Sequence, residues 1–121
     1  MHKPVPDQRP DIRAELNATH IAVIERLVVA GFLPAAFPLY ANAIGIRRGA
    51  VAALLTPEPG GRLKLVGQPL PLIEGNLSVR LERKGRQVFV WKKQEIAATA
   101  ELLEELARFA AELDHVLEGG S

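Results

Sequence analysis

The stretch Asn76–Lys93, NLSVRLERKGRQVFVWKK, decides the fold because it has the pattern of a β-hairpin. Its first half alternates aliphatic and polar residues, which is typical of a half-buried strand. A short polar turn follows at Arg83–Arg86, where Gly85 can adopt a positive φ. The segment Gln87–Trp91 is β-branched and aromatic, as strands prefer. We therefore predict two antiparallel strands joined at Lys84 and Gly85.

A two-residue turn fixes the register of this hairpin and gives its strands two different faces. One face is aliphatic and the other carries aromatic rings beside polar side chains. The expected cross-strand pairs are Ser78 with Trp91, Val79 with Val90, Arg80 with Phe89, Leu81 with Val88, and Glu82 with Gln87. Such neighbours lie about 5 Å apart, so Arg80 can stack on an aromatic ring. We expect helices to cover the aliphatic face, and another layer, a partner or a ligand to cover the aromatic face.

Length and composition define the class of protein. The chain has 121 residues, the size of one domain, and 48% of them are hydrophobic. It contains no cysteine, which excludes a disulfide framework and thiolate chemistry. The N-terminus lacks the apolar segment of a secretory signal, and no apolar run approaches the roughly 20 residues of a membrane span. We expect a soluble, cytoplasmic protein without a membrane partner.

Charge is distributed unevenly along the chain, although the net charge is only +1. Residues 47–93 carry ten basic and three acidic residues, whereas residues 94–121 carry seven acidic residues and one basic residue. The chain is therefore dipolar. Either the acidic C-terminal helix packs beside the basic strands and neutralises them, or a basic surface is left for an anionic partner.

An N-terminal helix is predicted before Gly31, which is a plausible stop. It begins at Ile12 if Asp11 is its cap, or as late as Thr19 if the first turns are weak. His20 lies on the apolar stripe of this helix near its polar start. We interpret it as a partly buried structural histidine.

A C-terminal helix is predicted over residues 100–117, with Thr99 as its N-cap and Gly119 as its stop. It carries a broad apolar stripe that needs a partner surface. Its members are Leu102, Leu103, Leu106, Phe109, Ala110, Leu113, Val116 and Leu117.

Residues 32–49 lie between the first helix and the first strand that we predict. Pro34 and Pro38 prevent a regular helix from starting before about residue 38. We expect a packed loop with a short helical turn at Leu39–Ala43, in which Phe37 and Tyr40 contribute aromatic rings.

The predicted fold is α+β, with a helix, an antiparallel meander of about four strands, and a second helix packed on one face of the sheet. The strands are expected over roughly 50–55, 62–73, 77–83 and 87–92, with a bend near Gly67. The aliphatic face to be covered holds Leu63, Leu65, Val79, Leu81, Val88 and Val90. A more curved, barrel-like sheet is the alternative. Residues 11–118 form the single domain, flanked by a flexible arm at 1–10 and a flexible tail at 119–121.

Catalytic and metal-binding patterns are missing from the sequence. The three histidines and three aspartates are scattered, no ligand-spaced pair occurs, and no glycine pattern matches a phosphate loop. A general acid or base could still be built from Glu74, Glu82 or Tyr40. We expect a protein that is not an enzyme and has no metal or other cofactor.

The sequence predicts a binding or assembly domain, and self-association as a homodimer is its leading form. The candidate interface is the aromatic face of the hairpin or the wide stripe of the last helix. Candidate interface or ligand-binding residues are Phe37, Tyr40, Arg80, Glu82, Phe89 and Trp91. We expect a second subunit or a loop of the same chain to cover Trp91.

Two other binding functions remain open. A small-molecule pocket between the sheet and residues 32–40, with apolar walls and a few polar groups, would suit an amphipathic ligand. Alternatively, the basic hairpin 80–93 could bind nucleic acid, with rings for stacking and cations for phosphates. The possible anion contacts are Arg83, Lys84, Arg86, Lys92 and Lys93.

Overall fold

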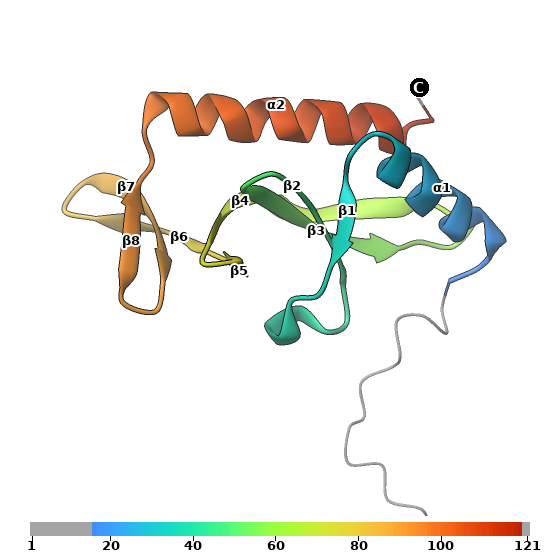
Figure 1. The fold of residues 1–121 in the computed structure, drawn as a ribbon, viewed down its shortest axis with the longest axis horizontal. Coiled ribbons are helices and arrows are strands. Elements are labelled where there is room, and N and C mark those ends of the chain that lie inside the picture. The colour runs from blue at the N-terminus through green and yellow to red at the C-terminus, as the bar shows by residue number, and fades with distance from the viewer. Residues whose placement is uncertain (1–15, 120–121) are drawn as a thin grey trace, which may run out of the picture.

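The computed structural model describes residues 16–119 and shows an α+β fold with two antiparallel sheets. The elements are α1 (Ala18–Val29), β1 (Leu33–Ala35), the 3-10 helix η2 (Pro38–Tyr40), β2 (Ile44–Arg48), β3 (Val51–Pro57), β4 (Leu63–Ile73), β5 (Asn76–Leu77), β6 (Val79–Arg83), β7 (Arg86–Trp91), β8 (Gln94–Ala97) and α2 (Ala100–Leu117). Strands β1–β5 form the large sheet and β6–β8 the small sheet, each in sequence order. Helix α2 runs over both sheets (Figure 1). The predicted fold class is confirmed, with more strands than expected.

The predictions for the arm 1–10 and for Gly120 and Ser121 lie outside the described residues. Within residues 16–119, no helix combines the length and apolar character that crossing a bilayer requires.

Helix α1 begins at a reciprocal cap. The Asn17 Oδ1 atom accepts hydrogen bonds from the backbone N–H groups of Thr19 and His20, at 2.9 and 3.0 Å. In return, the His20 Nδ1 atom accepts from the Asn17 backbone N–H at 3.0 Å. This is a capping box in which histidine takes the place of the usual glutamate or glutamine. The start is close to the later of the two predicted positions, and Asp11 lies outside the described residues.

His20 also attaches α1 to the turn between β3 and β4. Its side chain is only 3% exposed, and Nε2 lies 2.8 Å from the Glu58 carbonyl oxygen. Because Nδ1 accepts a hydrogen bond, the hydrogen is on Nε2, which donates to Glu58. Beside it, Gly61 has φ +92 and lies so close to Thr19 that a Cβ atom there would overlap the threonine side chain. The interpretation of His20 as a structural histidine is supported by these contacts.

Helix α2 matches its predicted bounds and supplies the centre of the core. The Thr99 Oγ1 atom caps it by accepting from the Leu102 N–H at 3.1 Å. Its buried side chains are Leu106, Phe109, Leu113 and Val116. They join one cluster with residues from α1, the large sheet and the small sheet. The Phe109 ring packs edge-on against Phe32, with centroids 5.1 Å apart.

Arg48 links the large sheet to α2. Its guanidinium carbon lies 4.3 Å from the Phe32 ring centroid and 5.7 Å from that of Phe109. The Nη2 atom also pairs with Glu112 at 2.7 Å. Among residues 16–119, this is the one ion pair between α2 and a strand. Direct charge neutralisation between the acidic helix and the basic strands is therefore confined to this place.

The stretch 32–49 contains two strands that we did not predict. Pro34 lies in β1, which is an edge strand of the large sheet. Proline is tolerated there because an edge strand does not need an N–H donor on its open side. The expected helical turn is present as η2. Strand β2 brings Gly45 beneath the Phe37 ring, and a Cβ atom there would overlap both that ring and the Ala35 carbonyl oxygen. Glycine is therefore required where Phe37 packs on the sheet.

The predicted bend near Gly67 is a β-bulge. Ala52 pairs with Leu70 and Leu54 pairs with Val66, so Ala53 alone faces residues 67–69. Gly67 has φ +68, a conformation that glycine adopts without strain. The bulge separates β4 into one part under α2 and another that leads toward the small sheet.

The hairpin register is confirmed at four of the five predicted pairs, from Val79 with Val90 to Glu82 with Gln87. Lys84 and Gly85 both have positive φ, as a type I′ turn requires. The fifth prediction, Ser78 opposite Trp91, is wrong, because β6 begins only at Val79 and the Ser78 backbone N–H donates to the Pro71 carbonyl instead. Ser78 is buried, and its Oγ atom donates to the Pro71 carbonyl at 2.6 Å. The chain passes at this residue from the large sheet to the small one.

The expectation that helices cover the aliphatic face of the hairpin is wrong for β6. Phe89 is fully buried in the main core, whereas Val79 and Leu81 are 45% and 39% exposed. The crossing at Ser78 separates the hairpin from the large sheet, so its two faces are no longer continuous with those of that sheet. The face that carries the larger side chain, Phe89, is the one turned toward the core, where it removes more apolar area from water.

Replacing His20 with alanine tests the attachment of α1. We expect His20→Ala to lower the free energy of unfolding by about 2–3 kcal/mol, because it removes both hydrogen bonds of a buried side chain. The Asn17 N–H loses its partner, and the Glu58 carbonyl keeps only the longer bond from the Gly61 N–H. Urea denaturation measures the change. Glu25→Ala, an exposed position on the same helix, is the control and should change stability by less than about 0.5 kcal/mol. Equal stability of the two variants would contradict the structural role.

Candidate functional site

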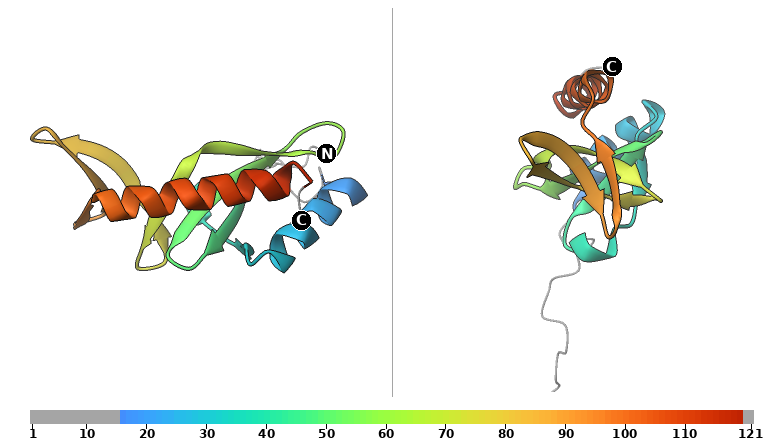
Figure 2. Two further views of the ribbon diagram at one scale, coloured as in Figure 1. Left: turned by 90° about the horizontal axis from the view of Figure 1, so that it is seen from above. Right: turned by 90° about the vertical axis from the view of Figure 1, so that its left-hand side faces the viewer.

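The candidate site is the small sheet, which lies at one end of the molecule. Seen from above, its β6–β7 hairpin projects past the N-terminal end of α2 (Figure 2). We call the side turned away from the main core the outer face and the side that carries Phe89 the inner face. From the strand register, the outer face carries Val79, Leu81, Arg83, Arg86, Val88, Val90, Glu95 and Ala97.

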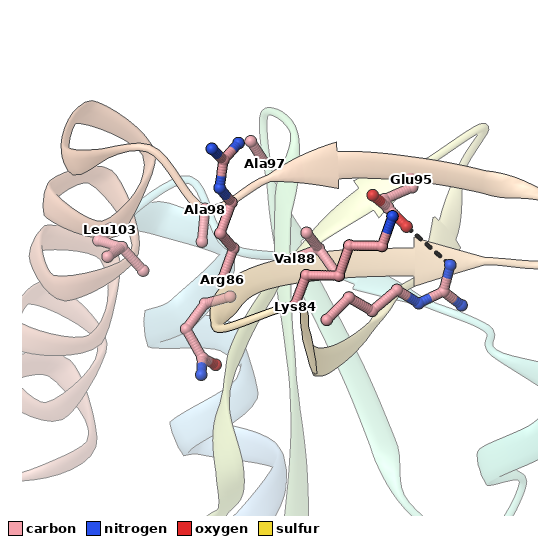
Figure 3. Close-up of a pocket in the computed structure, with 9 residues that line it drawn as sticks. Lys84, Arg86, Val88, Glu95, Ala97, Ala98 and Leu103 are labelled. Carbon is pink, nitrogen blue, oxygen red and sulfur yellow. Dashed lines mark hydrogen bonds and ion pairs between the residues drawn. The ribbon is translucent and has the colours of Figure 1, made fainter.

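An open groove of about 880 Å³ runs between the outer face and the first turns of α2 (Figure 3). Its apolar lining consists of Val88, Ala97, Ala98 and Leu103. Charged side chains line the rest, and Arg83 Nη1 pairs with Glu95 Oε1 at 2.9 Å across β7. Lys84 and Arg86 make no ion pair within residues 16–119, so the groove carries net positive charge.

Arg80 and Glu82 lie on the inner face of β6. The Arg80 Nε atom donates to Gln87 Oε1 at 3.0 Å, and its guanidinium carbon lies 5.9 Å from the Phe89 ring centroid. The predicted stacking of Arg80 on this ring is therefore present. Glu82 is exposed and makes no ion pair among the described residues. The two opposite charges thus flank Leu81 on the same strand without pairing with each other.

Trp91 is half-buried, and part of its cover comes from the same chain. Between its ring and η2 there is a space of only about 20 Å³, which Phe37 and Tyr40 also line. Such a space holds roughly one water molecule, so η2 and the indole line the same small hollow. The Lys92 ammonium nitrogen lies 5.6 Å from the ring centroid. This arrangement supports the alternative in which a loop of the same chain covers Trp91.

The structure does not bring together the polar groups proposed for a small-molecule pocket. Tyr40 lines an open hollow of about 620 Å³ beside Pro34 and Ile44. Arg80 lines a different hollow, of about 410 Å³, with Pro69 and Leu103. A ligand in the first hollow would therefore meet Phe37 and Tyr40, whereas Arg80 lines only the second.

The candidate anion contacts divide between two turns. Arg83, Lys84 and Arg86 surround the tip of the β6–β7 hairpin and line the groove. Lys92 and Lys93 form the β7–β8 turn at the other end of the small sheet. The Phe89 ring lies on the inner face, buried in the core, so it cannot stack with a base bound in the groove.

Sequence reasoning missed two features of this site. The first is β8, although the pair Lys92-Lys93 followed by Gln94–Ala97 is a possible turn and third strand. The second is the exposure of Val79 and Leu81, for which the sequence holds no local signal because their alternation is the same for either orientation of the hairpin.

No cluster of three histidine, cysteine, aspartate or glutamate residues that could hold a metal occurs within residues 16–119. Comparisons with protein-family models, curated proteins and solved structures find no match to this chain.

The fluorescence of Trp91 reports on its cover. Because Trp91 is half-buried within its own chain and shares a small hollow with η2, we expect an emission maximum that dilution does not change. Tyr40→Ala should shift the emission to longer wavelength by letting water reach the ring. Val29→Ala, on the exposed end of α1, is the control and should leave the spectrum unchanged. A red shift of the unsubstituted protein on dilution would show that a second subunit supplies the cover.

Proposed function

We propose that this chain is a self-associating assembly domain whose contact surface is the projecting small sheet. The exposure of Val79 and Leu81 carries the proposal. These aliphatic side chains adjoin half-buried Val90 in the sheet, and 45% of Val79 and 39% of Leu81 stay exposed among the described residues. Contiguous apolar surface rimmed by charge is typical of interaction sites.

The other surfaces that the sequence suggests for an interface belong in large part to the core. Phe89 and the buried stripe of α2, including Leu106 and Phe109, belong to one internal cluster. A partner could reach them only by opening the fold. This supports the outer face and the edge of β6 as the contact surface, instead of the aromatic face.

The edge of the small sheet adds a second reason. Among residues 16–119, strand β6 pairs only with β7, and all five of its residues are exposed. An exposed edge presents unpaired backbone groups, which are a template for another strand. Apolar side chains beside such an edge would be buried when a second strand is added.

Sedimentation velocity over a concentration series tests self-association. We expect a reversible dimer at tens of micromolar, since an interface of this small size is of the transient class. The double variant Val79→Ser, Leu81→Ser should weaken the dimer by about tenfold or more, because it removes the apolar contact. The control Val29→Ser changes a side chain that is 90% exposed on α1 and should leave the dimer unchanged. A monomer at all these concentrations would refute the proposal.

Binding of an anionic partner in the groove is a second candidate function. It is favoured by Lys84 and Arg86, which line the groove and make no ion pair within residues 16–119. The lining contains no aromatic residue, so contacts to a nucleic acid would be to its phosphates.

A labelled single-stranded oligonucleotide tests this second function by fluorescence anisotropy. We expect binding at low salt that weakens steeply as salt is raised. Lys84→Glu with Arg86→Glu should abolish it. Lys92→Glu with Lys93→Glu makes the same change of charge at the other turn and should retain most of the binding. Absence of binding at low salt would remove this function.

A further inference from the structure

We infer that β6 pairs antiparallel with β6 of a second copy, about a two-fold axis at Leu81. This inference rests on the proposed self-association and states which residues of the two copies lie opposite each other. The two small sheets would then form one continuous sheet of six strands. The partner is a second copy of this chain, because the order of charges on β6 is complementary to itself.

The directions of the backbone groups restrict where the two-fold axis can lie. Arg83 and Arg86 flank the two-residue turn, so they form a hydrogen-bonded pair, and so do Leu81 with Val88 and Val79 with Val90. The N–H and C=O groups of Arg80 and Glu82 therefore point away from β7, toward the open edge. They make no other backbone hydrogen bond within residues 16–119.

An axis at Leu81 uses all four of these groups. It sets Arg80 of one copy opposite Glu82 of the other, twice, and each pair exchanges two backbone hydrogen bonds. Leu81 meets Leu81 of the second copy as the closer, non-hydrogen-bonded pair. If the axis lay midway between two residues, each residue whose backbone groups point to the open edge would lie opposite one whose groups point to β7. The backbone hydrogen bonds between the two copies would then be lost.

Charge distinguishes this register from the two neighbouring registers, with the axis at Arg80 or at Glu82. An axis at Arg80 would set two arginines opposite each other, and one at Glu82 would set two glutamates opposite each other. Like charges directly opposite destabilise a sheet, whereas opposite charges stabilise it. The axis at Leu81 gives two complementary pairs and no like-charged pair.

The side chains are arranged for these contacts in the single chain. Gln87 and the Phe89 ring hold the Arg80 guanidinium on the inner face, and Glu82 lies on the same face without an ion pair. On the outer face, Leu81 would lose its exposure against its symmetry mate. The apolar surface and the charge order therefore favour the same register.

Two charge reversals test the register. In Arg80→Glu alone, glutamate faces glutamate at both pairs; in Glu82→Arg alone, arginine faces arginine. Each variant should dimerise about tenfold or more weakly than the original chain. An equimolar mixture should recover association, because a mixed dimer has two opposite-charge pairs. Circular dichroism of each variant checks that the fold is retained.

Cysteine cross-linking locates the axis independently, since the chain has no cysteine of its own. With Leu81→Cys, the two Cα atoms should lie about 4.5 Å apart, within disulfide range, so oxidation should give a covalent dimer. With Arg83→Cys, on the same face of the same strand, the two positions lie roughly 14 Å apart along the strands and should not cross-link.

The outcomes separate the register from self-association itself. Recovery on mixing, together with cross-linking at position 81 and not at 83, supports the inference. A dimer of the original chain with no recovery on mixing, or with equal cross-linking at both positions, overturns the register and leaves self-association standing. A monomeric original chain refutes both.

Discussion

The structure depends on a single apolar contact, that of α2 with two separate sheets. The helix has 18 residues and is therefore about 27 Å long, enough to lie over both sheets. Its buried side chains meet α1 and the large sheet, and the cluster that they form includes Phe89 of the small sheet. In the described part of the chain, no helix other than α2 lies over the junction of the two sheets (Figure 1). Both sheets are therefore placed where their apolar side chains can pack on the buried side chains of α2.

This shared core decides which face of the hairpin is available to a partner. Ser78 leaves the strand ladder to bond to Pro71, and the small sheet then turns its Phe89 side toward α2. The aliphatic side chains of β6 are left outward. The apolar surface that supports our proposal is therefore a consequence of the internal packing of Phe89.

The parts of the fold that could be predicted are those governed by neighbouring residues. Thr99 predicted the start of α2, Lys84-Gly85 predicted the turn, and Gly67 predicted the bulge, because capping, positive φ and a bend are properties of a few adjacent residues. Strand β1 was missed because Pro34 argues against a strand unless it lies at an edge, and its edge position depends on the tertiary fold.

Of the candidate site, only the cross-strand residue pairs of the hairpin could be predicted from the sequence. Arg80 opposite Phe89 follows from the turn, but which side of that pair meets the core depends on the crossing at Ser78 and on α2. Tyr40 lines a hollow beside Phe37 and Ile44, whereas Arg80 lines one between β4 and α2. Contacts between distant segments, unlike turns and caps, have no signature in the local sequence.

The charges of β6 have two effects that must be considered together. Charged side chains on an edge strand ordinarily prevent pairing with other chains, and Arg80 and Glu82 act in this way toward any strand that lacks a matching order of charges. A strand that presents glutamate to Arg80 and arginine to Glu82 meets no such barrier. Because antiparallel pairing reverses the order of residues, β6 presents this arrangement to its own copy. The same two residues that oppose unspecific pairing therefore favour the proposed dimer, and the fixed position of the small sheet under α2 reduces the entropy that association must overcome.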